Sequence, residues 1–155
     1  MSTQPVGSIV CWLSCASLAL LLGARPAQAA LGGNAESVTA DQTHLRASLR
    51  ILRAAQHSVH ELDLPTGTKV REYLGGDGKV FAVSWQGPFR PDLRQLLGAH
   101  YEAFLAAVGP RLARGPMNIA LPGLVIHMSG HQRAWYGRAY LPEQVPQNLS
   151  VEEIR

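Results

Sequence analysis

Apolar residues recur with helical spacing in residues 41–53. Leu45, Leu49 and Leu52 stand at positions i, i+4 and i+7, which places them on one face of an α-helix. Asp41 lies near the start, where the positive end of the helix dipole favours a carboxylate. The pattern therefore predicts an N-terminal amphipathic helix.

Three arginines, Arg46, Arg50 and Arg53, form a second stripe beside these leucines on the predicted helix. Such a stripe is typical of the solvated flank of a helix that packs on a core. The alternative is a surface that grips anionic lipid or polysaccharide. The flank is the interpretation that we favour.

After residue 56 the pattern changes to the alternation of β-strands, and proline and glycine divide the chain into short runs. The first three runs, residues 58–64, 68–74 and 79–85, predict a meander of antiparallel strands. In the third run, Phe81, Val83 and Trp85 share one face of the strand. We therefore expect that face to be covered by a second layer.

Residues 91–108 carry the strongest helical pattern of the chain, with Pro91 at the first helical position and Gly109-Pro110 at the end. We expect this helix to pack on the sheet. Gly98 lies inside it and indicates close approach to a neighbouring element.

Three more strand-like runs follow, residues 117–121, 124–128 and 131–141, and the last two are expected to form a hairpin. Strands before and after a central helix indicate an α+β domain. The prediction is an antiparallel sheet of about five to six strands with one main packed helix and an N-terminal amphipathic helix.

The first 29 residues have the pattern of a cleaved signal peptide. Residues 8–22 are almost entirely apolar, Gly23 to Pro26 interrupt the run, and Ala27-Gln28-Ala29 places small residues at the cleavage site. The alternatives are a retained membrane anchor and a lipid attached to Cys15. The apolar run is shorter than the roughly 20 residues of a spanning helix, so we expect export to the periplasm or secretion.

Residues 30–155 are expected to form one unit, with a flexible N-terminus at 30–36 and a single α+β domain at 37–155. Both cysteines, Cys11 and Cys15, fall in the signal peptide, so no disulfide is expected. Cleavage removes one of 14 basic residues and none of 11 acidic ones, which leaves a net charge near +2. With no basic run, the sequence predicts no nucleic-acid partner.

Histidine is the residue that best suggests chemistry, because His127 and His131 stand four residues apart. On a continuous strand they would lie about 13 Å apart, too far to share one metal ion. If Ser129-Gly130 formed the turn of a hairpin, they would face apart. We therefore predict no metal and no cofactor, and the chain after residue 29 holds no cysteine nucleophile and no G-x-S-x-G motif.

A cluster of aromatic and arginine residues is the better candidate site, because Trp, Tyr and Arg dominate binding hot spots. Trp135 and Tyr136 are neighbours on one predicted strand, so one of them must point away from the main core. Trp85 is in addition a candidate for the core. The candidate binding residues are Trp85, Arg90, Arg133, Trp135, Tyr136 and Arg138.

Several segments resemble an uncharacterised exported bacterial family, domain of unknown function 2844. The similar segments are His60-Glu61-Leu62, Leu64-Pro65-Thr66-Gly67-Thr68, Val70-Arg71-Glu72-Tyr73, the run from Val80 to Pro88, the run from Pro91 to Gly98, Ala30-Leu31-Gly32-Gly33 and Gly137-Arg138-Ala139-Tyr140-Leu141-Pro142. The resemblance implies a small exported protein, and it brings no catalytic residue and no ligand.

Two functions follow as hypotheses. The first is a non-catalytic binding module of the bacterial envelope, whose partner is an envelope protein or a cell-surface polymer. The alternative is a small periplasmic hydrolase that combines His127 or His131 with a distant carboxylate. A deep pocket with histidine and carboxylate would favour the hydrolase, and a shallow patch with arginines would favour binding.

Overall fold

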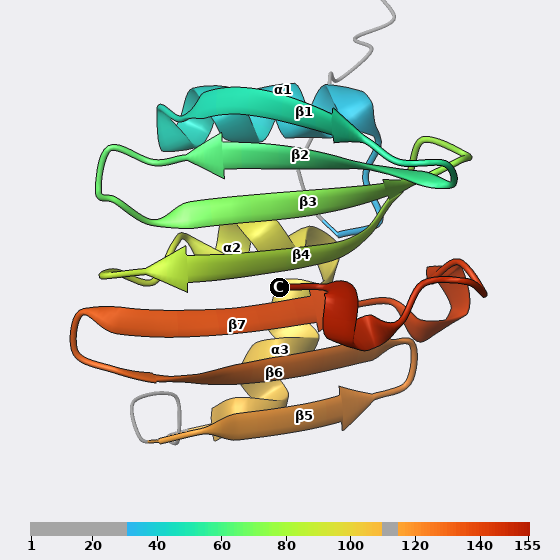
Figure 1. The fold of residues 1–155 in the computed structure, drawn as a ribbon. Coiled ribbons are helices and arrows are strands. Elements are labelled where there is room, and N and C mark those ends of the chain that lie inside the picture. Colours follow the sequence, from blue (N-terminus) through green and yellow to red (C-terminus); the bar gives the residue numbers. More distant parts are fainter. Residues whose placement is uncertain (1–30, 110–114) are drawn as a thin grey trace, which may run out of the picture.

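A seven-stranded antiparallel sheet runs through the computed structural model, which describes residues 31–109 and 115–155 (Figure 1). In space the strands follow the order β1-β2-β3-β4-β7-β6-β5. Strands β1 to β4 form a meander, and β7 joins β4 to the last two strands. The strands are β1 (Ser48–Arg53), β2 (His57–Asp63), β3 (Lys69–Gly75), β4 (Val80–Gly87), β5 (Met117–Leu121), β6 (Leu124–His131) and β7 (Ala134–Tyr140).

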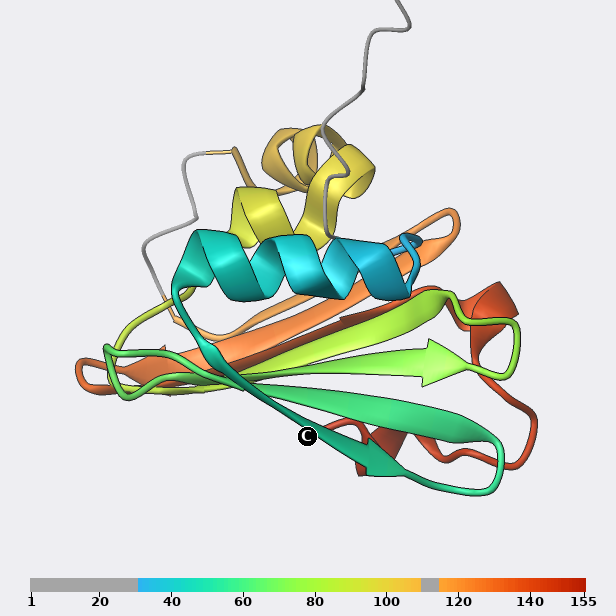
Figure 2. The same cartoon turned by 90° about the horizontal axis from the view of Figure 1, so that it is seen from above.

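Helices cover one face of this sheet, which we call the helical face. They are α1 (Ala35–Leu45), α2 (Leu93–Leu97) and α3 (Tyr101–Val108), with the 3₁₀ turn η1 (Gly98–His100) between the last two. The C-terminal segment, with the 3₁₀ turns η3 (Pro142–Gln144) and η4 (Val151–Glu153), lies on the other side (Figure 2). We call that side the open face.

The main hydrophobic core lies between the sheet and the helices. Leu96, Leu97 and Phe104 of the helices are fully buried, and they pack in one cluster with strand residues such as Val83 and Ile126. Burying a side chain of this size contributes roughly 1.5–3 kcal/mol to folding. A smaller cluster on the open face joins Tyr73, Phe81 and Ala82 of the sheet to Ile154 of the C-terminal segment.

The meander predicted for residues 58–85 is confirmed as β2, β3 and β4, and the predicted hairpin is confirmed as β6 and β7. Its turn is not at Ser129-Gly130, because His131 still pairs with Ala134. Arg133 takes the positive φ of 69° that this turn requires. The C-terminal capping box of Ser150 and Glu153 also forms, at the start of η4.

The sheet has seven strands rather than five to six, because the second half of the predicted N-terminal helix is a strand. Asn34 caps α1, and the helix ends where Arg46 adopts the left-handed conformation with a φ of 52°. Residues 48–53 then pair along β2, with Leu49 opposite Leu62. The leucine spacing fits both structures, and pairing with the otherwise unpaired edge of β2 decides the outcome.

The predicted stripe of Arg46, Arg50 and Arg53 is therefore wrong. Arg46 ends the helix, and Arg50 pairs with Glu61 across the strands β1 and β2. Successive strand residues point to opposite faces, so Arg50 and Arg53 lie on different sides of β1.

The predicted helix over 91–108 is interrupted at Gly98, which has a φ of 49°. Asp92 caps α2 through hydrogen bonds from the amides of Arg94 and Gln95. The break makes two short helices of one predicted long one, and a residue with a Cβ would be strained at this φ.

Residues 31–34, which belong to the N-terminal segment expected to be flexible, contact the rest of the fold. Leu31 is 3% exposed, and its amide donates to the Leu96 carbonyl at 3.0 Å. Gly32 and Gly33 exchange backbone hydrogen bonds with Val80. These contacts fasten the start of α1 to β4 and α2.

The predicted signal peptide at 1–29 lies outside the described residues. Within residues 31–109 and 115–155, every helix is too short or too polar to cross a bilayer.

Two buried carboxyl groups lie between α1 and the sheet. Asp41 of α1 and Glu72 of β3 are both fully buried, and they lie close enough for each carboxyl group to shift the pKa of the other. Gln95 of α2 donates to Asp41 Oδ1 at 2.6 Å. Two like charges this close cannot both be ionised without a large cost, so the pair holds a proton.

The pKa values agree with a shared proton. Burial, followed by the charge of Asp41 and the hydrogen bond with it, raises the pKa of Glu72 well above its ordinary value. Burial also raises the pKa of Asp41 to about 6, although its hydrogen bonds with Glu72 and Gln95 act in the opposite direction. Glu72 is thus the proton donor of the pair, and it joins α1 to the centre of the sheet.

This pair predicts that the protein loses stability as the pH rises. Both pKa values are higher in the folded state than in the unfolded state, so the pair stabilises fully below about pH 4. The contribution is lost as the pH rises through about 6 and further for Glu72. Glu72→Gln keeps a donor without the titrating proton, and we expect its midpoint of thermal unfolding to exceed that of the wild type by about 3 °C or more at pH 8.

At pH 5 the midpoint of thermal unfolding of Glu72→Gln should exceed that of the wild type by a smaller amount. Glu61→Gln is the matched control, because Glu61 has a lowered pKa and stabilises above its ordinary pKa. That variant should lose stability at both pH 5 and pH 8. Parallel pH profiles for the wild type and Glu72→Gln would contradict the shared proton.

Candidate binding cleft

Cross-strand pairing brings polar side chains from distant parts of the sequence into rows on the open face. Arg138 of β7 pairs with Ser84 of β4 on one side and with His127 of β6 on the other. His127 in turn pairs with Asn118 of β5. The row therefore crosses four strands, and directly opposite residues have side chains close enough to act together.

A second row runs beside the first, from Gln86 of β4 through Tyr136 of β7 to Ser129 of β6. Together the two rows line an open cleft of about 500 Å³ on this face. The complete lining consists of Trp85, Gln86, Pro116, Asn118, His127, Met128, Ser129, Tyr136, Gly137, Arg138, Ile154 and Arg155. The cleft is lined by two arginines, one histidine and several residues with amide or hydroxyl groups, together with apolar surface.

His127 is held in a fixed orientation at the centre of the cleft. Its Nδ1 lies 2.9 Å from Asn118 Oδ1, and its ring stacks on Tyr140 with 6.2 Å between the ring centres and 11° between the planes. If Nδ1 donates to the amide oxygen, Nε2 is left as an acceptor. Burial, with a smaller effect of Arg138, lowers the pKa of His127, which favours the neutral ring.

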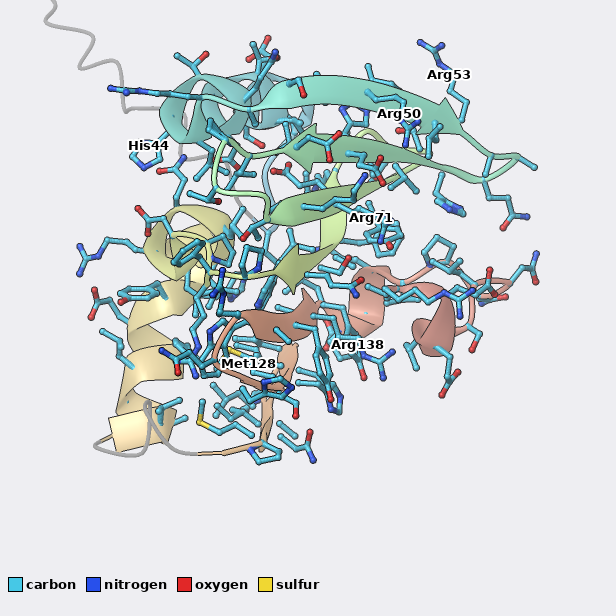
Figure 3. The ribbon with its side chains drawn as sticks, turned by 60° about the vertical axis from the view of Figure 1, so that its left-hand side comes forward. His44, Arg50, Arg53, Arg71, Met128 and Arg138 are labelled. Atoms are coloured by element: carbon cyan, nitrogen blue, oxygen red, sulfur yellow. The ribbon has the colours of Figure 1, made fainter. Side chains whose placement is uncertain are left out.

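Arg138 connects the floor of the cleft to the C-terminal segment. It donates from one terminal nitrogen to the Val151 carbonyl at 2.6 Å, and it lies on the side of the sheet that carries this segment (Figure 3). A guanidinium group has five N–H donors, so further donors can serve a ligand. Among the described residues Arg138 makes no ion pair.

The C-terminal residues form one wall of the cleft. Arg71 and Tyr73 of β3 donate to the backbone oxygen of Arg155, and the Tyr73 hydroxyl also accepts from the Arg155 amide at 3.1 Å. Ile154 is 1% exposed and packs into the open-face cluster. This wall is therefore fixed by both polar and apolar contacts.

Beside the cleft, three cations surround one buried carboxylate. Glu61 accepts from Lys69 Nζ at 2.8 Å, from Arg71 Nε at 2.8 Å and from Arg50. Burial alone would raise its pKa, but these hydrogen bonds lower the pKa of Glu61 to about 2. The charges of this group are satisfied within the fold, so it is a structural cluster rather than a site for a ligand.

The structure separates the six candidate binding residues. Tyr136 and Arg138 meet in the cleft, and Tyr136 is the exposed aromatic residue of the Trp135-Tyr136 pair, with 55% of its surface exposed. Trp135 lies toward the other face, where the Arg90 guanidinium stacks over its ring at 3.9 Å. Arg133 is in the β6–β7 turn.

Trp85 belongs to the core, with 3% of its surface exposed. It pairs with Gly137 across β4 and β7, and its ring fills the space that a Cβ at Gly137 would need. Trp85 is therefore a core residue, which was the alternative to a binding role.

Sequence reasoning missed Asn118, Gln86 and Ser129 as cleft residues, and it considered His127 only for metal binding or catalysis. These residues share no motif, and only strand register places them together. His127 and His131 both lie on the continuous strand β6. In the described part of the chain, no three His, Cys, Asp or Glu side chains converge as metal ligands.

The different environments of the two aromatic residues predict opposite effects of truncation. Tyr136→Ala should leave the midpoint of thermal unfolding within about 3 °C of the wild type, because the ring is largely exposed. Trp85→Ala should cost about 3–5 kcal/mol, because it leaves a cavity in the core. Thermal unfolding followed by circular dichroism measures both, and a large loss in Tyr136→Ala would show that this ring is part of the core.

The comparisons with known proteins agree with the resemblance of the sequence. The model of a family described as protein of unknown function, DUF2844, matches residues 27–154. No curated protein and no solved structure matches the chain. Since the match covers most of the 155 residues, the chain belongs to the DUF2844 family of proteins of unknown function.

Proposed function

We propose that the protein is an exported, non-catalytic binding module of the bacterial envelope and that the open-face cleft is its binding surface. The observation that carries this proposal is the meeting of Tyr136, Arg138 and His127 in one accessible hollow. Residues of these types combine apolar contact area with directed hydrogen bonds, as binding sites require. The partner is an envelope protein or a cell-surface polymer.

The surroundings of His127 favour binding over the hydrolase alternative. A catalytic histidine is commonly oriented by a carboxylate that also stabilises the imidazolium form. Here an amide, Asn118, orients the ring, and Arg138 disfavours a positive charge on it. The cleft lining in the described residues contains no Asp or Glu side chain.

His131 offers no better catalytic arrangement. It lies at the end of β6, its side chain is exposed, and its Nδ1 is 3.1 Å from the neighbouring Gln132 carbonyl. A general base in a hydrolase needs a partner that holds it near the substrate. Neither histidine therefore gives specific support to hydrolysis.

Export is supported by the pattern of residues 1–29. An apolar run followed by Ala27-Gln28-Ala29 is typical of a signal peptide with its cleavage site. The described core begins at Leu31, so removal of residues 1–29 takes away none of its residues.

The export proposal predicts the mass of the mature protein. When the full chain is expressed in a Gram-negative host, the periplasmic fraction should contain a form that lacks residues 1–29. Intact-mass spectrometry after osmotic shock measures this directly. Recovery of the full-length chain from the membrane fraction would contradict cleavage and support a retained anchor.

In-cell crosslinking tests the binding function. We expect the wild type to capture a specific envelope component, identified by mass spectrometry, and Tyr136→Ala and Arg138→Gln to lose most of it. The matched control is Arg53→Gln, which removes an exposed arginine from β1 at the far edge of the sheet.

The identified component must also bind the purified wild-type protein and bind the two cleft variants at least tenfold more weakly. Equal capture by wild type and cleft variants would place the binding surface elsewhere. Turnover of a chromogenic ester or glycoside that is lost in His127→Ala would instead favour the hydrolase.

A further inference from the structure

We propose that the cleft binds an acidic saccharide, with the carboxylate of one sugar unit on Arg138 and the neighbouring hydroxyl groups on His127 and Asn118. This inference rests on the proposed binding function and names the class of ligand. Three properties of the cleft carry it: an unpaired guanidinium group, mixed donors and acceptors, and an exposed aromatic ring.

The first property is the charge. Arg138 makes one hydrogen bond, to a backbone carbonyl, and no ion pair in the described residues. The charge of Arg138 acts on Glu152, but the Glu152 side chain is bound to the Ser150 hydroxyl. The remaining guanidinium donors match the planar geometry of a carboxylate, which they can bind through two parallel hydrogen bonds.

Arg71 on the same face has a different charge balance from Arg138. Arg71 stands two strands away in the same row, and its Nε donates to Glu61 while a terminal nitrogen donates to the Arg155 backbone. The charge of Arg71 is thus neutralised within the fold, and the charge of Arg138 remains available to a ligand.

The second property is the pairing of donors with acceptors. The neutral His127 ring, oriented by Asn118, offers an acceptor at Nε2, and the amide of Gln86 and the hydroxyl of Ser129 each offer both functions. A sugar hydroxyl also donates and accepts, so it can bridge an acceptor and a donor in this cleft. Such a lining differs from the apolar cavities that hold lipid chains.

The third property is the Tyr136 ring, which is 55% exposed beside Arg138. An aromatic face with an adjacent polar edge suits the apolar C–H face of a sugar and its hydroxyl groups. The net charge near +2 and the two arginines of the cleft do not provide the basic surface that nucleic acid requires.

The size and openness of the cleft favour a segment of polymer over a lone sugar. Its lining crosses four neighbouring strands, β4, β7, β6 and β5, which corresponds to a width of about 14 Å. The cleft is open to the surface, so it does not enclose its ligand on all sides. We therefore expect oligosaccharides to bind more tightly than the single sugar acid.

The test uses protein purified from cells that express the full chain and probes of defined chemistry. Isothermal titration calorimetry compares galacturonic acid, oligogalacturonates of increasing length and neutral galacto-oligosaccharides of the same length. Each is measured with the wild type, Arg138→Gln, Arg138→Lys, Tyr136→Ala and the control Arg53→Gln. Thermal unfolding of each variant establishes that it is folded.

We expect oligogalacturonates to bind the wild type at least tenfold more tightly than the neutral series. Arg138→Gln should lose at least tenfold in affinity for the acidic series, and Arg138→Lys should recover part of it, because the charge remains and the planar fork is lost. Tyr136→Ala should weaken binding while its folding stays intact, and Arg53→Gln should bind as the wild type does. Added salt should weaken binding of the acidic series.

Equal affinity for acidic and neutral oligosaccharides, or full affinity in Arg138→Gln, would overturn the inference. No binding of any saccharide, together with a protein partner that is captured by the wild type and lost in Tyr136→Ala, would overturn it and leave the proposed function standing. No binding of saccharides and no partner that depends on the cleft would overturn both.

Discussion

The pairing of β4 with β7 joins two parts of the sheet that are about 50 residues apart in sequence. Residues 82–87 pair with residues 135–140, and Trp85 packs against the bare backbone of Gly137 at the centre of this pairing. Any larger residue at 137 would push the Trp85 ring out of its place in the core. The core on the helical face and the floor of the cleft on the open face both depend on this contact.

The buried carboxyl groups on the two faces of the sheet have different charge states. On the open face Glu61 keeps its charge, because Arg50, Lys69 and Arg71 donate to it. On the helical face Glu72 and Asp41 share a proton, and no ion pair with either carboxyl group is present among the described residues. A buried carboxyl group costs least when it is either paired or neutral, and this fold uses both solutions.

The cleft lies on the open face because that face is only partly covered. The helical face is closed by α1, α2 and α3, so polar groups such as Asp41 and Glu72 are buried there. The C-terminal segment covers only part of the open face, and beyond it Arg138, His127 and Tyr136 remain accessible. The arrangement suits recognition of a polar ligand, because the donors are held in place before the ligand arrives.

The sequence by itself determined most of the strands, the central helical region and the family. Alternation of apolar residues and the positions of proline and glycine marked β2, β3 and β4, because these signals are local. The same local signals favoured a helix across residues 45–53, where the leucine spacing fits a helix and a strand equally well. Pairing with β2 decided for the strand, and that pairing is a tertiary contact.

The candidate site shows the same division. The sequence indicated that one of Trp135 and Tyr136 must face away from the core, because neighbours on a strand point to opposite sides. It could not place Tyr136 and Arg138 of β7 beside His127 of β6 and Asn118 of β5. Only the register of these strands fixes which side chains meet, and register is set by packing over the whole sheet rather than by any short motif.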